Sequence, residues 1–141
     1  MSVITLDFQP DILISSQTKK LDFIYRPYVF IKLGNGNKWS KNFIRSLIDS
    51  GADYNVFPSA FAKEIGINYE AGQKHKTTGV GGQLMTTYLH VVKIKVNSRE
   101  IDTVVSFGKE IETPLLGRQG FFNYFDRITF IVKSKTLELE Y

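Results

Sequence analysis

An apolar segment runs directly into an acidic residue near the middle of the chain. Its residues, in order, are Leu47, Ile48, Asp49, Ser50, Gly51, Ala52 and Asp53. A strand that ends on Asp49 would deliver a carboxylate to a reaction site, where it could take a proton from water. Asp-Ser-Gly also makes an ordinary turn, because Asp and Ser side chains bond their own backbone and Gly accepts a positive φ. These residues alone leave both interpretations open.

Other kinds of catalytic site find little support in the sequence. The chain has no cysteine, which excludes disulfides, thiolate metal sites and thiol catalysis. Without cysteine ligands, the two histidines, His75 and His90, are too few for a zinc site. Ser50 lacks the glycine-flanked elbow of a serine nucleophile, and Gly79-Val80-Gly81-Gly82 lacks the Lys and Ser/Thr that follow in a phosphate loop. We therefore expect neither a metal nor a cofactor.

Three motifs, in order along the chain, resemble those of the retropepsins, the retrovirus-type aspartic peptidases that also have cellular and bacterial relatives. The first is the segment around Asp49, preceded by the stretch from Arg26 to Leu33 and followed by Val56-Phe57-Pro58. The second, residues 79–82, is similar to the glycine-rich tip of the family's flap. The third, residues 114–118 (Pro-Leu-Leu-Gly-Arg), is similar to the element before the family's short C-terminal helix. Each motif is weak alone, and the three together are specific.

The resemblance implies an aspartic endopeptidase that cleaves peptides or proteins with an activated water. This chemistry needs two carboxylates, one ionised and one protonated, and aspartic proteases are the standard example of such a pair. One chain supplies one such motif, because Asp53, Asp102 and Asp126 are not followed by a hydroxyl residue and a glycine. We therefore expect a homodimer in which Asp49 of each chain is catalytic. The alternative is an inactive retropepsin-like dimer that serves as a peptide-binding or assembly module.

The resemblance also assigns supporting roles around Asp49. Ser50 is expected to bond across the two-fold axis, and Gly51 to let the two backbones approach each other. Ala52 has no hydroxyl to donate to the carboxylate, which favours a working range of roughly pH 5 to 6.5. Asp53 and Arg118 are expected to form an ion pair beneath the site. The alternative for this pair is a surface contact worth less than ~1 kcal/mol.

The flap is expected to bind substrate. Its residues are Gly79, Val80, Gly81 and Gly82, where the glycines allow a mobile hairpin tip and Val80 presents a backbone amide toward the peptide.

Period-two alternation and β-branched residues predict a mainly β chain that positions these motifs. Together with the resemblance they predict a retropepsin-like acid-protease barrel, with one half-site per chain and one or two short helices. Strands are expected at 3–8, 27–33, 43–49, 84–96, 100–107, 127–133 and 136–140, helices at 58–65 and 119–124, and a loop at 9–22. We divide the chain into an N-terminal extension packed on the domain (1–24) and the protease domain (25–141).

Composition and charge narrow the class of partners. The 141 residues are 43% hydrophobic and 23% charged, as in ordinary globular chains of one domain. The net charge is +4, but the Lys and Arg residues are scattered, and Lys93 and Lys95 alternate with apolar residues as on the solvated face of a strand. We therefore expect no nucleic-acid partner. No segment resembles a membrane span or a secretion signal, which predicts no membrane partner and a cytoplasmic location.

Overall fold

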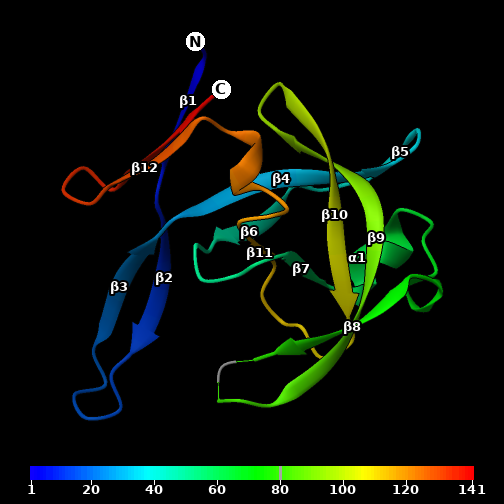
Figure 1. Cartoon of the computed structure of the whole chain (residues 1–141). Coiled ribbons are helices and arrows are strands. Elements are labelled where there is room, and N and C mark those ends of the chain that lie inside the picture. The colour runs from blue at the N-terminus through cyan, green and yellow to red at the C-terminus, as the bar shows by residue number, and fades with distance from the viewer. Residues whose placement is uncertain (80) are drawn as a thin grey trace.

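The computed structural model describes residues 1–79 and 81–141, and most of its elements are β-strands (Figure 1). The strands are β1 (Val3–Asp7), β2 (Gln9–Ile14), β3 (Leu21–Arg26), β4 (Tyr28–Asn35), β5 (Lys38–Trp39), β6 (Ile44–Ile48), β7 (Asn55–Pro58), β8 (Gln73–Thr78), β9 (Leu84–Val96), β10 (Arg99–Gly108), β11 (Leu115–Leu116), β12 (Arg127–Ile131) and β13 (Thr136–Glu140). One α-helix, α1 (Ser59–Glu64), and two 3₁₀ helices, η1 (Tyr69–Ala71) and η2 (Phe122–Tyr124), complete the elements. The predicted mainly β fold is confirmed. No helix in the two described ranges is long and apolar enough to cross a membrane.

Six strands close into a barrel. The main sheet has the order β5-β4-β6-β11-β7-β10-β9-β8, and β4 makes an additional pairing with β9 that aligns Leu33 with Ile94. This pairing joins strands from distant places in the sheet, so that β4, β6, β11, β7, β10 and β9 form a ring. Closure leaves these strands without a free edge, while β5 and β8 extend the ring at its margins.

The barrel interior is filled by alternate residues of its long strands. Val29, Ile31 and Leu33 on β4 are buried, as are Val92, Ile94 and Val96 on β9. Lys93 and Lys95 fall between the buried residues of β9, and successive side chains of a strand point to opposite faces. The alternation predicted for this strand is therefore present. The expected helix at 58–65 appears as α1, which is followed by Gly66 at φ +77°.

The two chain ends meet in a separate three-stranded sheet with the order β1-β13-β12. Its central strand β13 buries Leu137 and Leu139, and Ile4 of β1 lies opposite Leu139. The C-terminal hairpin expected from residues 127–140 is thus confirmed. Its pairing with β1 is long-range and could not be read locally. The division of the chain at residue 25 stays a prediction.

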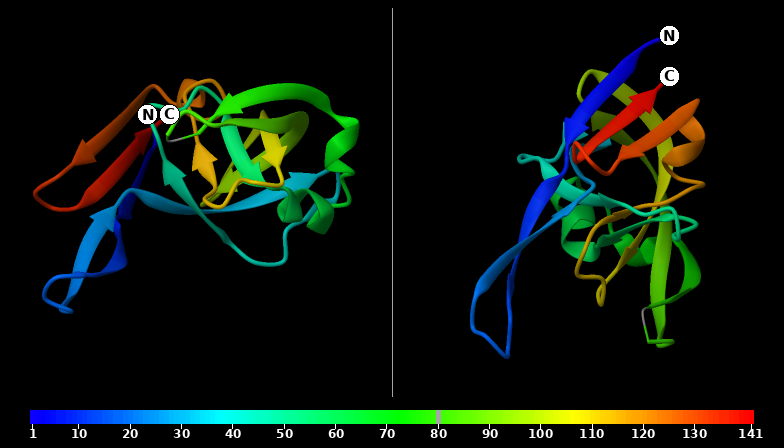
Figure 2. Two further views of the ribbon diagram at one scale, coloured as in Figure 1. Left: turned by 90° about the horizontal axis from the view of Figure 1, so that it is seen from below. Right: turned by 90° about the vertical axis from the view of Figure 1, so that its left-hand side faces the viewer.

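Two expectations for local structure are wrong. Residues 9–22 do not form a loop, because β2 pairs with β3 in an antiparallel hairpin. This hairpin, residues 9–26 and called the arm below, projects away from the barrel (Figure 2). The polar turn at 15–20 masked two short strands in the sequence. The helix expected at 119–124 is reduced to η2, because the backbone before it is tied to the barrel at Gly120.

Candidate active site

Asp49 follows the last residue of β6, a strand held on both sides. Ile44, Ser46 and Ile48 of this strand are buried, and β6 pairs with β4 on one side and β11 on the other. The backbone N–H of Asp49 donates to the carbonyl of Leu116 at 3.0 Å. The strand therefore fixes the position of the Asp49 backbone, and the residue as a whole is half-buried.

The residues after Asp49 form a tight turn around its carboxylate. The backbone N–H of Gly51 donates to Oδ1 of Asp49 at 2.8 Å, and the N–H of Ala52 donates to the Asp49 carbonyl at 3.2 Å. A Cβ atom on Gly51 would lie 3.2 Å from Oδ1, which is closer than most side chains tolerate. In the described part of the chain no hydrogen bond reaches Oδ2. Ser50 and Gly51 are exposed at the tip of the turn.

An ion pair joins the end of this turn to the segment after β11. The Arg118 guanidinium binds the Asp53 carboxylate, and both side chains are more than half exposed. Two backbone bonds reinforce the contact, from the Arg118 N–H to the Ala52 carbonyl at 2.9 Å and from the Gln119 N–H to the Asp53 carbonyl at 2.7 Å. The expected pair is present. In a single chain its exposure limits its electrostatic contribution to less than about 1 kcal/mol.

Asn55 is a structural centre that the sequence did not reveal. Its side chain is fully buried, accepts from the Gly117 N–H at 3.0 Å, and donates to the carbonyls of Gly120 at 2.7 Å and Val104 at 3.2 Å. Thr103 adds a second donor to the Gly120 carbonyl at 2.6 Å. These bonds join the start of β7, just after the Asp49 turn, to β10 and to the loop after β11. A polar residue placed directly before the apolar pair Val56-Phe57 was the available signal.

Two glycines allow this close approach of backbones. A Cβ atom on Gly117 would collide with the Tyr54 carbonyl, and one on Gly120 would collide with the Asn55 amide. Gly117 belongs to the third sequence motif. The close backbone contact explains why a glycine stands there, and no positive φ is involved.

The predicted flap is the β-hairpin that β8 makes with residues 84–89 of β9, whereas the rest of β9 belongs to the barrel. Its strands end at the pair Thr78 and Leu84, and the tip closes with a bond from the Gly79 N–H to the Gln83 carbonyl at 2.9 Å. Gly81 and Gly82 have φ values of +96° and +84°, which favour glycine. Val80 lies outside the described residues. The hairpin extends on the side of the barrel at which β6 ends (Figures 1 and 2).

The structure thus brings the turn residues 49–53 and Arg118 into one bonded cluster, whereas the flap glycines lie on a separate hairpin. Neither histidine joins the bonded cluster, since His75 lies on β8 of the flap hairpin and His90 lies on β9. One ring nitrogen of His90 lies 2.7 Å from the Tyr69 carbonyl, and His75 packs edge-on against Tyr54. Across residues 1–79 and 81–141, no group of three acidic or histidine residues is placed to hold a metal.

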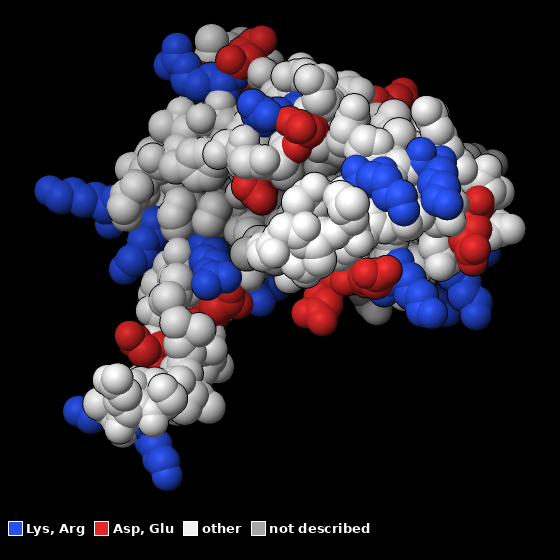
Figure 3. Space-filling model, turned by 60° about the horizontal axis from the view of Figure 1, so that its bottom comes forward, with Lys and Arg blue, Asp and Glu red and all other residues white. Residues whose placement is uncertain are grey.

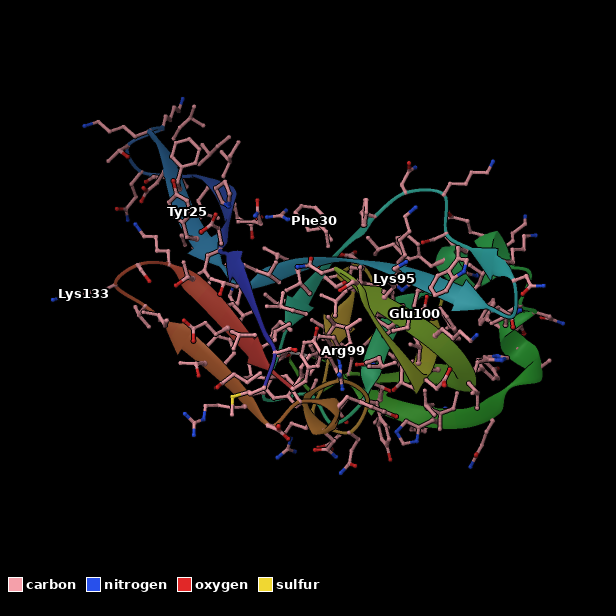
Figure 4. The ribbon with its side chains drawn as sticks, turned by 90° about the horizontal axis from the view of Figure 1, so that it is seen from above. Tyr25, Phe30, Lys95, Arg99, Glu100 and Lys133 are labelled. Carbon is pink, nitrogen blue, oxygen red and sulfur yellow. The ribbon has the colours of Figure 1, made fainter. Side chains whose placement is uncertain are left out.

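A groove of about 650 Å³ lies elsewhere, at the base of the arm. Its lining includes Leu6, Gln9, Tyr28, Phe30 and Phe43, and no residue of the Asp49 turn. Figure 4 shows Phe30 close to the foot of the arm. The groove therefore does not belong to the candidate active site.

Comparison with known proteins gives a family and a structural neighbour. The sequence model of the family described as Aspartyl protease matches residues 34–119, which include the Asp49 turn, the flap and Arg118. Among solved structures, the EIAV protease in complex with the inhibitor HBY-793 is similar to this chain, with a TM-score of 0.49 and 25% identity over 74% of this chain and 88% of that one. No curated protein matches in sequence. The family match covers more than half of the chain, which therefore belongs to the aspartyl protease family.

Proposed function

We propose that the protein is an aspartic endopeptidase whose active site forms between two copies of the chain. The observation that carries this proposal is the turn at Asp49, within the segment that matches the family. The Gly51 N–H holds one carboxylate oxygen at 2.8 Å, and the other oxygen is left for a water molecule.

A second copy supplies the second carboxylate. Within the chain, Asp53 is the nearest acid in sequence, and it is engaged by Arg118. Two Asp49 residues related by a two-fold axis would share a water, and close carboxylates stabilise a single shared proton between them. The exposure of Ser50 and Gly51 at the tip of the turn supports this arrangement, in which each residue would meet its symmetry mate.

The proposed reaction is a direct attack by water. The ionised Asp49 takes a proton from the water, the oxygen attacks the peptide carbonyl, and the protonated Asp49 donates its proton to the carbonyl oxygen. The tetrahedral intermediate then collapses: the carboxyl proton of one Asp49 moves to the leaving amine, and a hydroxyl proton of the intermediate moves to the carboxylate of the other Asp49, which leaves the pair singly protonated again. The flap, with its Gly81-Gly82 tip, would close over the peptide and exclude bulk water.

Substitution of Asp49 tests the catalytic role. Asp49→Asn should lower kcat/KM on a mixed peptide library by about 100- to 10,000-fold or more, because an amide cannot accept the proton of the water. The matched control is Asp102→Asn, an exposed aspartate on β10, which should keep normal activity. Circular dichroism should show both variants folded. Near-normal turnover by Asp49→Asn would overturn the assignment, and binding of peptides without any cleavage by the unmodified protein would favour the inactive peptide-binding module.

A mixing experiment tests the two-chain site. Excess Asp49→Asn protein should suppress the activity of the unmodified chain, because each mixed dimer has one functional carboxylate. Excess Asp102→Asn protein should instead add activity. If the inactive variant exchanged freely between dimers but left activity unchanged, each chain would have to contain a complete active site, and the two-chain proposal would be wrong.

A further inference from the structure

The arm is a two-stranded ribbon with one entirely uncharged face. Residues directly opposite each other in an antiparallel pair point to the same face of the ribbon, and successive residues of one strand point to opposite faces. The register pairs Pro10 with Tyr25, Ile12 with Phe23 and Ile14 with Leu21. These six side chains therefore form one face, called the apolar face below, whereas the charged residues of the two strands, Asp11, Asp22 and Arg26, lie on the other.

The apolar face is exposed to solvent in the single chain. Ile12, Ile14 and Leu21 are 63–70% exposed, and Phe23 is 54% exposed. Exposed apolar clusters of this kind mark interaction surfaces in soluble proteins. Figure 3 shows the arm as a mostly uncharged finger that leaves the body, with basic side chains at its end.

The foot of the arm is anchored, so that the arm keeps one direction. The Asp11 carboxylate accepts from the Tyr28 hydroxyl at 2.7 Å and from Arg45 at 2.9 Å, and Arg26 lies at 3.5 Å. On the apolar face, the ammonium group of Lys135 lies over the Tyr25 ring at 4.7 Å, which links the arm to the turn of the C-terminal hairpin. Lys133 belongs to the same turn as Lys135. In Figure 4 it lies on the same side of the molecule as Tyr25. An isolated hairpin is only marginally stable in water, and these contacts leave the apolar face beyond Tyr25 exposed.

We infer that the apolar face packs against a second copy of this chain, and that each copy grips the other with its arm. This inference rests on the proposed function, which requires two Asp49 turns to meet. The arm and the end of β6 lie toward the same side of the molecule in Figures 1 and 2, so a partner that brings its Asp49 to this side comes within reach of the arm. In a two-fold arrangement the contact occurs twice.

The chemistry of the face fits such an interface. The interior of a protein interface is depleted of charge and enriched in large apolar side chains, as this face is. A stable dimer buries about 800 Å² on each partner, and the five large side chains of each arm would contribute a substantial share. The tip of the arm, by contrast, is polar from Ser15 to Lys20, which does not suit tip-first insertion into a lipid bilayer.

Polar substitutions on the apolar face provide the first test. The double variant Ile12→Ser/Phe23→Ser should raise the dimer dissociation constant, measured by sedimentation velocity over a concentration series, by at least about tenfold. Its activity per chain should fall at low concentration and recover at high concentration. The control is Val91→Ser on β9, which is 77% exposed and lies outside the arm, and it should change neither quantity.

Single cysteines provide a second test that does not depend on activity, because the chain has no cysteine of its own. Phe23→Cys carrying an environment-sensitive dye should show a blue-shifted emission as the protein is concentrated into dimers. A dye at Val91→Cys should keep the same emission. Unchanged emission at position 23 throughout the monomer–dimer transition would overturn the inference even if the double variant failed to fold.

The remaining outcomes separate this inference from the proposed function. If the double variant dimerises normally but shows a higher KM for protein substrates and not for short peptides, the arm is a substrate-docking surface and the inference is wrong. It is also wrong if dimerisation is unchanged and binding to lipid vesicles is lost. If only the inference is wrong, the protein still shows Asp49-dependent hydrolysis. If the proposed function is wrong, no such hydrolysis is seen at any protein concentration.

Discussion

Replacement of Asn55 should destabilise the fold more than the loss of one polar side chain usually does. Asn55→Ala removes an acceptor from the Gly117 N–H and donors from the Gly120 and Val104 carbonyls. Gly120 keeps the Thr103 hydroxyl as a donor. The buried Gly117 N–H loses the Asn55 acceptor, and such an orphaned group costs about 1–3 kcal/mol.

The other effects add to this value. Loss of two further hydrogen bonds costs about 0.5–1.5 kcal/mol each, and the small cavity left by the amide adds roughly 1 kcal/mol. The free energy of unfolding should therefore fall by about 3 kcal/mol or more. For a chain of this size the melting temperature should drop by roughly 10 °C.

Urea unfolding followed by Trp39 fluorescence measures this change at fixed protein concentration. The matched control is Asn123→Ala, since Asn123 is exposed and its side chain makes one bond, to Gln119 at 3.3 Å. This control should lose less than about 0.5 kcal/mol. A loss below about 1 kcal/mol for Asn55→Ala would refute the view that Asn55 holds the two loops together.

Three further predictions concern the flap, the turn and the arm. Gly81→Val should lower turnover far more than melting temperature, because a branched side chain resists φ +96° at the flap tip. The control Gly36→Val, at φ +60° in a turn outside the flap, should lower stability alone. Equal losses of turnover and melting temperature for Gly81→Val would point to a merely structural loop. The pH–rate profile should peak at roughly pH 5 to 6.5, and Ala52→Ser should move both limbs toward acid if the hydroxyl reaches the Asp49 carboxylate; coincident profiles would show that this position does not set the working pH. The hydrogen bond from Tyr28, together with the Arg45 and Arg26 guanidinium groups, holds the pKa of Asp11 below its usual value of 3.8, so its anchoring contribution is present above that pH and lost as the pH falls below it. The difference in melting temperature between the unmodified chain and Asp11→Asn should accordingly be seen at pH 6 and shrink as the pH falls below 3.8, and a difference that stays constant over that fall would contradict the role of the charge.

Local patterns in the sequence predicted the parts of the fold that depend on neighbours along the chain. The alternation of Val92, Ile94 and Val96 with lysines identified β9 with its observed bounds, because strand geometry places alternate side chains on one face. The turn after Ile48 and the glycine tip of the flap were predicted for the same reason, since their conformations are set by the types of a few adjacent residues. Gly81 indeed has the positive φ expected there.

Contacts between distant segments were decided only by the tertiary structure. The pairing of β4 with β9 that closes the barrel joins residues about 60 positions apart, and no local pattern specifies its register. Asn55 could be read as a turn residue until the structure placed it among Gly117, Gly120 and Val104. The arm was mistaken for a loop because its apolar residues are not buried within the chain, and burial is what alternation in sequence usually reports. The sequence by itself identified Asp49 as the candidate carboxylate, the turn that follows it and the glycines of the flap, because these are properties of short segments. The position of that turn against β11, the buried amide behind it and the exposed ribbon beside it depend on long-range packing, which only the folded chain defines.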